Sequence, residues 1–180
     1  MSKNVYLTGF MASGKSTIGP ILANTIGWDF FDLDDVIEKK ERKKVREIFE
    51  EKGEEYFRKV ETECLTELSL RENLVISLGG GTVASDKNCS IIKNTGVLIY
   101  LKSSPEMAYK RLRFKRDRPQ LLFPGDDEPD KSKFINRINL LMEKRIKYYE
   151  QADFVIDTDS KPVGKTVDLI SAYLRNKLSV

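Results

Sequence analysis

Histidine is absent from this sequence, and cysteine occurs only at Cys64 and Cys89. Without histidine the chain lacks the commonest general base and a common metal ligand, so catalysis must rest on carboxylates, lysines, arginines and backbone groups. One pair of cysteines in 180 residues is no disulfide framework. We therefore expect both thiols to be reduced and the protein to be cytoplasmic.

Long apolar runs are also missing. No run approaches the roughly 18 residues that a membrane span requires. The chain passes from Met1 through three further residues directly into a predicted strand, which leaves no room for a signal peptide. The net charge is only +3, too small to indicate nucleic-acid binding by itself.

What is present is a regular alternation of strand-like and helix-like segments along the whole chain. A length of 180 residues predicts one domain, residues 1–180. The alternation predicts an α/β fold, a parallel sheet covered by helices on both faces, with ligands beyond the carboxyl ends of the strands. Strands are predicted at 5–8, 29–32, 74–78, 96–101 and 152–157, helices at 15–26, 34–41, 45–51, 54–71, 105–113, 130–150 and 162–178, and a long loop at 116–129.

The loop between the first strand and the first helix carries the most specific motif. Gly9 to Thr17 matches G-x-x-x-x-G-K-[ST] in the strand–loop–helix setting that the motif requires. Its glycines let backbone N–H groups converge on a phosphate, and the following helix presents its positive end to the same anion. Lys15 adds a charge for the outer phosphates, and Ser16 can ligate Mg²⁺. The alternative, an ordinary turn with a surface lysine, is disfavoured by that setting.

Acidic and glycine residues follow two further strands. Asp32 and Asp34 alternate after the second strand, so both can face the ligand crevice. Asp32 is the best candidate to hold Mg²⁺, which leaves Asp34 for a substrate hydroxyl. The alternative is that one of these two acids caps the next helix, a role that Asp34 and Asp35 both suit. The glycines from Gly79 to Gly81 permit close approach to a ligand or unusual dihedral angles, with a flexible turn as the alternative.

The arginines are ambiguous from spacing alone. Arg58 is four residues from Glu54 and three from Glu61, which favours a surface salt-bridge ladder. Arg145 lies near a helix end, where a cation suits the helix dipole anyway. Residues 110–119 hold six basic side chains. We favour the hinge of a lid over a triphosphate rather than a nucleic-acid patch, because the net charge is low.

Together these motifs resemble the shikimate kinases, small P-loop kinases, over nearly the whole chain. The P-loop is common to many proteins, whereas the ordered combination is specific. The matching pieces are residues 9–19, Phe31-Asp32-Leu33-Asp34 with Ile37-Glu38, Ile48-Phe49, Gly53-Glu54, Phe57-Arg58 and Glu61, Leu78-Gly79-Gly80-Gly81, Arg118-Pro119 before Leu121-Leu122, and Lys144-Arg145 before Tyr148-Tyr149.

The resemblance implies a three-layer P-loop kinase fold with a five-stranded parallel sheet in the order 2-3-1-4-5. It implies a mobile lid at about residues 112–125 and shikimate-binding helices at about residues 33–62. The implied reaction is ATP-dependent phosphorylation of the 3-hydroxyl of shikimate, on the route to chorismate and aromatic amino acids, by a cytoplasmic monomer without nucleic-acid or membrane partners. The alternatives are a gluconate or nucleotide kinase on the same fold and a non-catalytic nucleotide-sensing module.

The resemblance also implies residue roles. Lys15, Asp34 and Arg118 are expected to be catalytic, with Ser16 on Mg²⁺ and Asp32 holding the ion through water. Where the family often has glycine this chain has Ala12, which is costly if that position needs a positive φ, and Gln120 leaves Arg116 as an alternative to Arg118. The expected ATP-binding residues are Ala12, Ser13, Gly14, Lys15, Ser16, Thr17, Arg111, Arg118 and Lys161, and the expected shikimate-binding residues are Asp34, Arg58, Gly80, Gly81 and Arg145.

Overall fold

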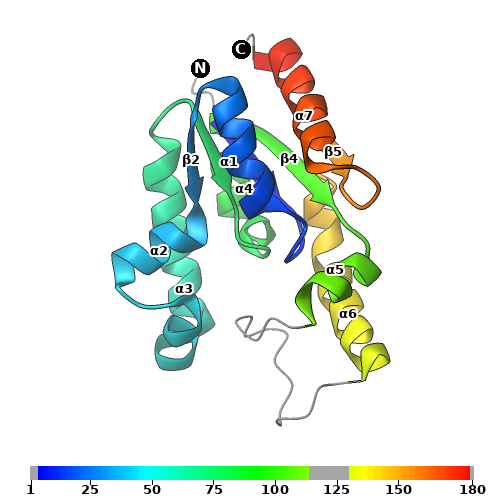
Figure 1. The fold of residues 1–180 in the computed structure, drawn as a ribbon. Helices are drawn as coiled ribbons and strands as arrows, with labels where there is room; N and C mark the ends of the chain where they lie inside the picture. Colours follow the sequence, from blue (N-terminus) through cyan, green and yellow to red (C-terminus); the bar gives the residue numbers. More distant parts are fainter. Residues whose placement is uncertain (1–3, 114–129, 179–180) are drawn as a thin grey trace.

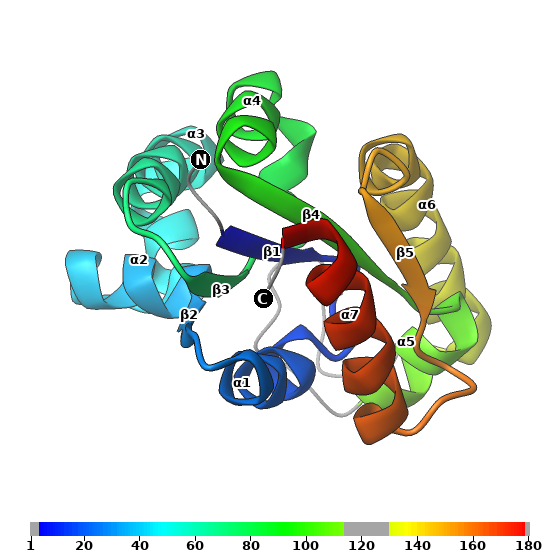
Figure 2. The same cartoon turned by 90° about the horizontal axis from the view of Figure 1, so that it is seen from above.

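A computed structural model describes residues 4–113 and 130–178. Within them a single sheet has the strand order β2-β3-β1-β4-β5, and every neighbouring pair is parallel (Figures 1 and 2). The predicted strand order is therefore confirmed. The strands are β1 (Asn4–Thr8), β2 (Asp29–Asp32), β3 (Leu74–Ser77), β4 (Gly96–Lys102) and β5 (Phe154–Asp157).

The helices follow the predicted pattern, with one omission. A short 3₁₀ turn and the helix α4 fill residues 82–95, where the sequence prediction had no element. Ser85 caps α4 by accepting a hydrogen bond from the amide of Asn88 at 3.4 Å. The helices are α1 (Lys15–Ile26), α2 (Leu33–Glu41), α3 (Val45–Ser69), η1 (Thr82–Ala84), α4 (Asp86–Thr95), α5 (Pro105–Leu112), α6 (Lys131–Tyr149) and α7 (Val163–Leu178).

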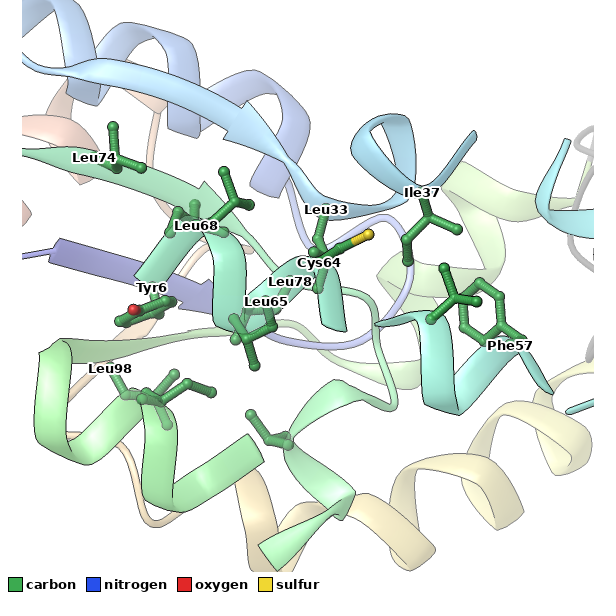
Figure 3. Close-up of a cluster of buried hydrophobic side chains, with 14 of the residues drawn as sticks. Tyr6, Leu33, Ile37, Phe57, Cys64, Leu65, Leu68, Leu74, Leu78 and Leu98 are labelled. Carbon is green, nitrogen blue, oxygen red and sulfur yellow. The ribbon is translucent and has the colours of Figure 1, made fainter. Parts of the chain in front are cut away.

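Helices cover both faces of the sheet, as Figure 2 shows from above. On one face α1 and α7 pack against Val5 and Leu7 of β1. On the other, α3 and α4 pack against a cluster that includes Tyr6 and Leu98 (Figure 3). Successive residues of β1 thus face opposite cores, which explains why its three central residues, Val5 to Leu7, are all apolar.

The long helix α3 is kinked at Gly53. This glycine has φ 82° and ψ 172°, outside the helical range, so the two helices predicted on either side of it appear as one kinked unit. A positive φ of this size is readily adopted only by glycine. By contrast α1 runs without interruption through Pro20.

A third apolar cluster joins the phosphate-binding loop to α5 and α6. Phe10 of the loop packs with Ala108 and Leu112 of α5 and with Phe134 and Ile138 of α6. Figure 1 shows α5 and α6 on one side of the carboxyl ends of the strands and α2 and α3 on the other. In residues 4–113 and 130–178, none of the helices is long and apolar enough to cross a membrane.

Candidate active site

A cleft of about 1400 Å³ runs along the carboxyl ends of the strands. Its walls include the loop from Met11 to Thr17, the acids after β2, the first glycines after β3, and Arg111 and Lys161. A smaller pocket, lined by Arg58, Gly81 and Arg145 among others, shares Asp34, Gly79 and Gly80 with the cleft. The three strand ends expected to hold ligands therefore line one continuous site.

In the phosphate-binding loop, Gly14 precedes α1 with φ 105°, a conformation that favours glycine. The first N–H groups of a helix have no carbonyl partner within it and can receive an anion. The ammonium of Lys15 donates hydrogen bonds to the carbonyl oxygens of Gly9 at 2.8 Å and Phe10 at 3.0 Å. Lys15 thus folds back over the loop, and both are expected to bind the phosphates of the nucleotide.

Ala12 occupies the third position of a turn closed by the hydrogen bond from the Ser13 amide to the Phe10 carbonyl, 3.1 Å long. Its φ is 60°, so the position does require the left-handed conformation that glycine adopts at little cost. Two side chains contact the consecutive carbonyls of Ala12 and Ser13. Arg111 donates to Ala12 O at 2.9 Å, and the buried Thr158 hydroxyl, whose one proton is shared with Lys102 O at 3.0 Å, lies 3.2 Å from Ser13 O.

Asp32 makes two local contacts. Its Oδ2 accepts a hydrogen bond from the hydroxyl of Ser16 at 3.3 Å, and its Oδ1 accepts one from the amide of Asp34 at 3.0 Å. The second bond makes Asp32 the N-cap of α2. The alternative that one of the two acids caps the helix is therefore confirmed for Asp32. Asp34 and Asp35, which also suited that role, lie inside α2, because the helix begins at Leu33, one residue earlier than predicted.

The glycines after β3 lie against four charged side chains. A β-carbon on Gly79 would come within 3.1 Å of Glu61 Oε1 and 3.2 Å of Asp34 Oδ1. One on Gly80 would come within 3.1 Å of Arg145 Nη1, and one on Gly81 within 2.7 Å of Arg58 Nη2. None of the three glycines has a positive φ. Their role is therefore to allow close approach, not to provide unusual dihedral angles.

Arg58 bonds to both acids expected from its spacing: Nη1 lies 2.9 Å from Glu61 Oε2 and Nη2 lies 3.1 Å from Glu54 Oε1. The expected surface ladder is only half right, because Glu61 is 0% exposed and its other oxygen accepts from the Thr82 hydroxyl at 2.7 Å. Burial alone would lower the pKa of Arg58, but the charges and hydrogen bonds of Glu61 and Glu54 raise it above its ordinary value.

Arg145 is 9% exposed, on the last turns of α6. Beside it is Tyr149, whose hydroxyl donates to the carbonyl oxygen of Gly80 at 2.5 Å. Burial raises the pKa of Tyr149 to about 12, against the lowering effect of the Arg145 charge and hydrogen bond.

Between Thr158 and Lys161, which line the cleft, Asp159 anchors the loop before α7. Its carboxylate accepts from the Ser103 hydroxyl and the Ser104 amide, both at 2.7 Å. Burial would raise the pKa of Asp159, but these hydrogen bonds and the charge of Arg111 hold it below its ordinary value. Lys161, two residues on, lies 3.4 Å from the carbonyl of Asp157.

Comparison with known proteins decides the family. The family model for shikimate kinase matches residues 11–175. The chain belongs to the shikimate kinase family. It is 45% identical over 174 residues to the shikimate kinase of Chlorobaculum tepidum, covering 97% of this chain and 91% of that one. It is 44% identical over 164 residues to that of Chlorobaculum parvum, covering 91% and 88%.

Comparison with solved structures supports the same family. The shikimate kinase from Acinetobacter baumannii in complex with shikimate is 32% identical with a TM-score of 0.86, covering 99% of this chain and 94% of that one. The enzyme from Aquifex aeolicus is 36% identical with a TM-score of 0.80, covering 97% and 98%. A gluconokinase from Sinorhizobium meliloti, 17% identical with a TM-score of 0.60, shares the fold alone. The prediction of a shikimate kinase, an ATP-dependent phosphotransferase, is thereby confirmed.

The structure of this shikimate kinase brings most of the predicted site residues together. Lys15, Ser16, Asp32, Asp34 and Arg111 line the cleft, and Arg58, Gly80, Gly81 and Arg145 line the smaller pocket that joins it. Arg118, its alternative Arg116 and nearly all of the predicted lid lie outside the described residues; Leu112, where the lid was expected to begin, is the buried last residue of α5.

Sequence reasoning missed the contacts that hold these groups. It gave no role to Tyr149, Thr158 or Thr82, each of which bonds to a backbone or side chain of the site. It also gave none to Asp159, which bonds to Ser103 and Ser104 at the start of α5. The Tyr148-Tyr149 pair was noticed as part of a motif, but nothing in its spacing distinguishes the tyrosine that bonds to the glycine turn. Such pairings join residues far apart in the chain, as with Tyr149 and Gly80, which periodicity does not report.

Proposed function

We propose that this cleft transfers the γ-phosphoryl group of ATP to the 3-hydroxyl of shikimate, giving shikimate 3-phosphate and ADP. The observation that carries the assignment of roles is the convergence of Asp34, Arg145 and Arg58 on three consecutive glycines beside the P-loop. Shikimate carries a ring carboxylate and several hydroxyl groups. Two arginines and one carboxylate acceptor, side by side, suit that combination.

The nucleotide takes the other part of the cleft. The P-loop amides and Lys15 bind its phosphates, replacing the contacts of Lys15 to the Gly9 and Phe10 carbonyls. Arg111 and Lys161 line the cleft and not the acceptor pocket, which supports a place for them beside the nucleobase. Arg118, or Arg116 in its place, contacts the transferring phosphoryl group.

The donor set of Ser16 and Asp32 suits Mg²⁺. Both supply hard oxygen ligands, and they lie 3.3 Å apart. The described residues contain no group of three or more histidine, cysteine, aspartate or glutamate side chains that could hold an ion by themselves. Mg²⁺ commonly uses one or two protein ligands together with water and substrate phosphates. When bound here, with Ser16 on the ion and Asp32 holding it through water, it would neutralise phosphate charge.

Asp34 receives the proton of the attacking hydroxyl. The hydroxyl oxygen forms a bond to the γ-phosphorus as the bond from that phosphorus to the leaving oxygen of ADP breaks, and the proton passes to the Asp34 carboxylate. Because phosphoryl transfer depends mainly on positioning and charge neutralisation, the absence of histidine is no obstacle. Arg58 and Arg145 hold the acceptor carboxylate through charge-assisted hydrogen bonds.

We also propose that residues 1–180 act as a single domain and a monomer, since the acceptor and nucleotide parts of the cleft come from one chain. The two cysteines are free thiols, which supports a cytoplasmic location.

A coupled ADP-release assay with shikimate, gluconate and nucleoside monophosphates tests the proposal. Turnover with shikimate and none with the others is expected, and a Lys15→Ala variant should lose it. Turnover only with gluconate or a nucleotide would reassign the acceptor. Calorimetric binding of ATP without any phosphoryl transfer would instead favour a nucleotide-sensing module.

A further inference from the structure

The hydroxyl of Tyr149 lies between two parts of the proposed acceptor site. Tyr149 is the last residue of α6 and only 1% of it is exposed. Its hydroxyl donates a hydrogen bond to Gly80 O at 2.5 Å and accepts a second one from the side chain of Arg145. Arg145 is four residues earlier on the same helical face. A phenol can donate one hydrogen bond and accept others, so a single hydroxyl serves both contacts.

Both side chains meet over Gly80. A β-carbon placed there would lie 3.1 Å from Arg145 Nη1 and 3.7 Å from the Tyr149 oxygen. Three consecutive glycines have wide conformational freedom, and ordering them costs more entropy than ordering other residues. The hydrogen bond to the Gly80 carbonyl fixes the peptide plane between Gly80 and Gly81, and with it the direction of the Gly81 amide.

The tyrosine ring is itself held in place. It stacks on Tyr100 of β4 with ring centroids 5.0 Å apart and an interplanar angle of 28°. The sheet therefore sets the position of the Tyr149 oxygen. With its pKa raised to about 12, the phenol keeps its proton throughout the neutral range and remains a donor to Gly80.

We propose that Tyr149 is a positioning residue for acceptor binding, whose hydroxyl holds Arg145 and the Gly80–Gly81 peptide in the arrangement that receives the acceptor. This inference rests on the proposed function, since it takes Arg145 and Gly80 as acceptor-binding groups. Arg145 and Gly80 line the acceptor pocket whereas Tyr149 stands behind them, so the tyrosine acts through these two groups.

Steady-state kinetics of a Tyr149→Phe variant test this role, because phenylalanine keeps the ring stacked on Tyr100 and removes only the hydroxyl. Tyr148→Phe is the matched control, one residue away on the same helix. We expect Tyr149→Phe to raise the KM for shikimate about tenfold, the effect of losing one buried hydrogen bond. The KM for ATP should stay within about twofold in both variants. A tyrosine with only a packing role would lower the melting temperature and leave both KM values unchanged, which would overturn the proposal.

Amide hydrogen exchange gives a second readout that needs no substrate. The amide of Thr82 donates to Gly79 O at 3.1 Å and closes the glycine turn. Tyr149→Phe should accelerate exchange at this amide about tenfold, while Tyr148→Phe leaves it unchanged. Equal exchange rates in both variants would contradict the proposal that the Tyr149 hydroxyl fixes the glycine turn.

The activity of the wild-type protein separates the proposed function from the proposed role of Tyr149. If wild type phosphorylates gluconate and not shikimate, the proposed function fails, and the same KM comparison made with gluconate still decides the role of Tyr149. If wild type phosphorylates neither, the exchange rate at Thr82 decides it. In an Arg145→Lys background the Tyr149→Phe effect on the acceptor KM should shrink, whereas full additivity would show that the hydroxyl does not act through Arg145.

Discussion

The guanidinium of Arg111 donates a 2.9 Å hydrogen bond to the carbonyl oxygen of Ala12, a residue with a φ of 60°. A left-handed conformation costs a non-glycine residue roughly 1–2 kcal/mol. One hydrogen bond of this kind contributes about 1.5–3 kcal/mol when one partner is charged. The two quantities are similar, so α5 can hold the P-loop in a shape that alanine alone disfavours.

Ala12→Gly should therefore stabilise the protein by about 1 kcal/mol, or about 2–4 °C in melting temperature for a domain of this size. The substitution should also make the KM for ATP less dependent on Arg111. This dependence is the change in KM that Arg111→Met causes in the wild type and in the Ala12→Gly variant. The control is Ala23→Gly in α1, where glycine replaces a buried helical alanine and should destabilise by a similar amount. A lower melting temperature for Ala12→Gly would argue against strain at this residue.

Arg58→Ala should weaken shikimate binding far more than ATP binding, as calorimetry would measure. It should also lower stability by about 1–3 kcal/mol, because Glu61 would remain buried without its cation. Adding Glu61→Gln should recover much of the lost stability but none of the shikimate affinity. An equal loss of affinity for both substrates in Arg58→Ala would refute its role in the acceptor pocket.

Asp34→Asn should lower kcat by about a hundredfold or more, because an amide cannot accept the hydroxyl proton. The variant should fold normally, since the cap of α2 is Asp32 and the cap contact to residue 34 uses its backbone amide. Asp35→Asn, in the same helical turn, is the control, and its kcat should fall much less. A kcat for Asp34→Asn within about twofold of wild type would remove Asp34 from the catalytic step.

The lowered pKa of Asp159 predicts that the folded protein loses stability in acid. Because its pKa in the folded state lies below the ordinary 3.8, its stabilising contribution is present above that value and is lost as the pH falls through the folded-state pKa. Asp159→Asn should lower stability at pH 7 and flatten the decline in acid. Denaturant unfolding between pH 7 and pH 3 measures this, with exposed Asp168→Asn as the control. Parallel declines for Asp159→Asn and wild type would contradict the assignment.

The parts of the molecule that follow from local pattern were predictable. The P-loop sits between β1 and α1 as its motif requires, and the apolar β1, β3 and β4 form the centre of the parallel sheet. The contacts that depend on neighbours in three dimensions could not be predicted in this way. Spacing correctly paired Arg58 with Glu61, yet it did not indicate that Glu61 is buried against Thr82, twenty-one residues away. Residue type alone left the cap of α2 open among neighbouring aspartates, and Asp32 caps the helix because β2 ends there and α2 begins at Leu33.

The glycine turn after β3 has a further consequence for how this pocket tolerates mutation. A β-carbon at each position would crowd groups of the pocket: Glu61, Thr82 and Asp34, all within 3.2 Å, at Gly79, Arg145 at Gly80 and Arg58 at Gly81. Each substitution would therefore force at least one of these groups to shift from the position it occupies in the pocket. An inhibitor bound against this turn would therefore leave the protein few single-residue routes to resistance there, because each one would impair the reaction that it was meant to preserve.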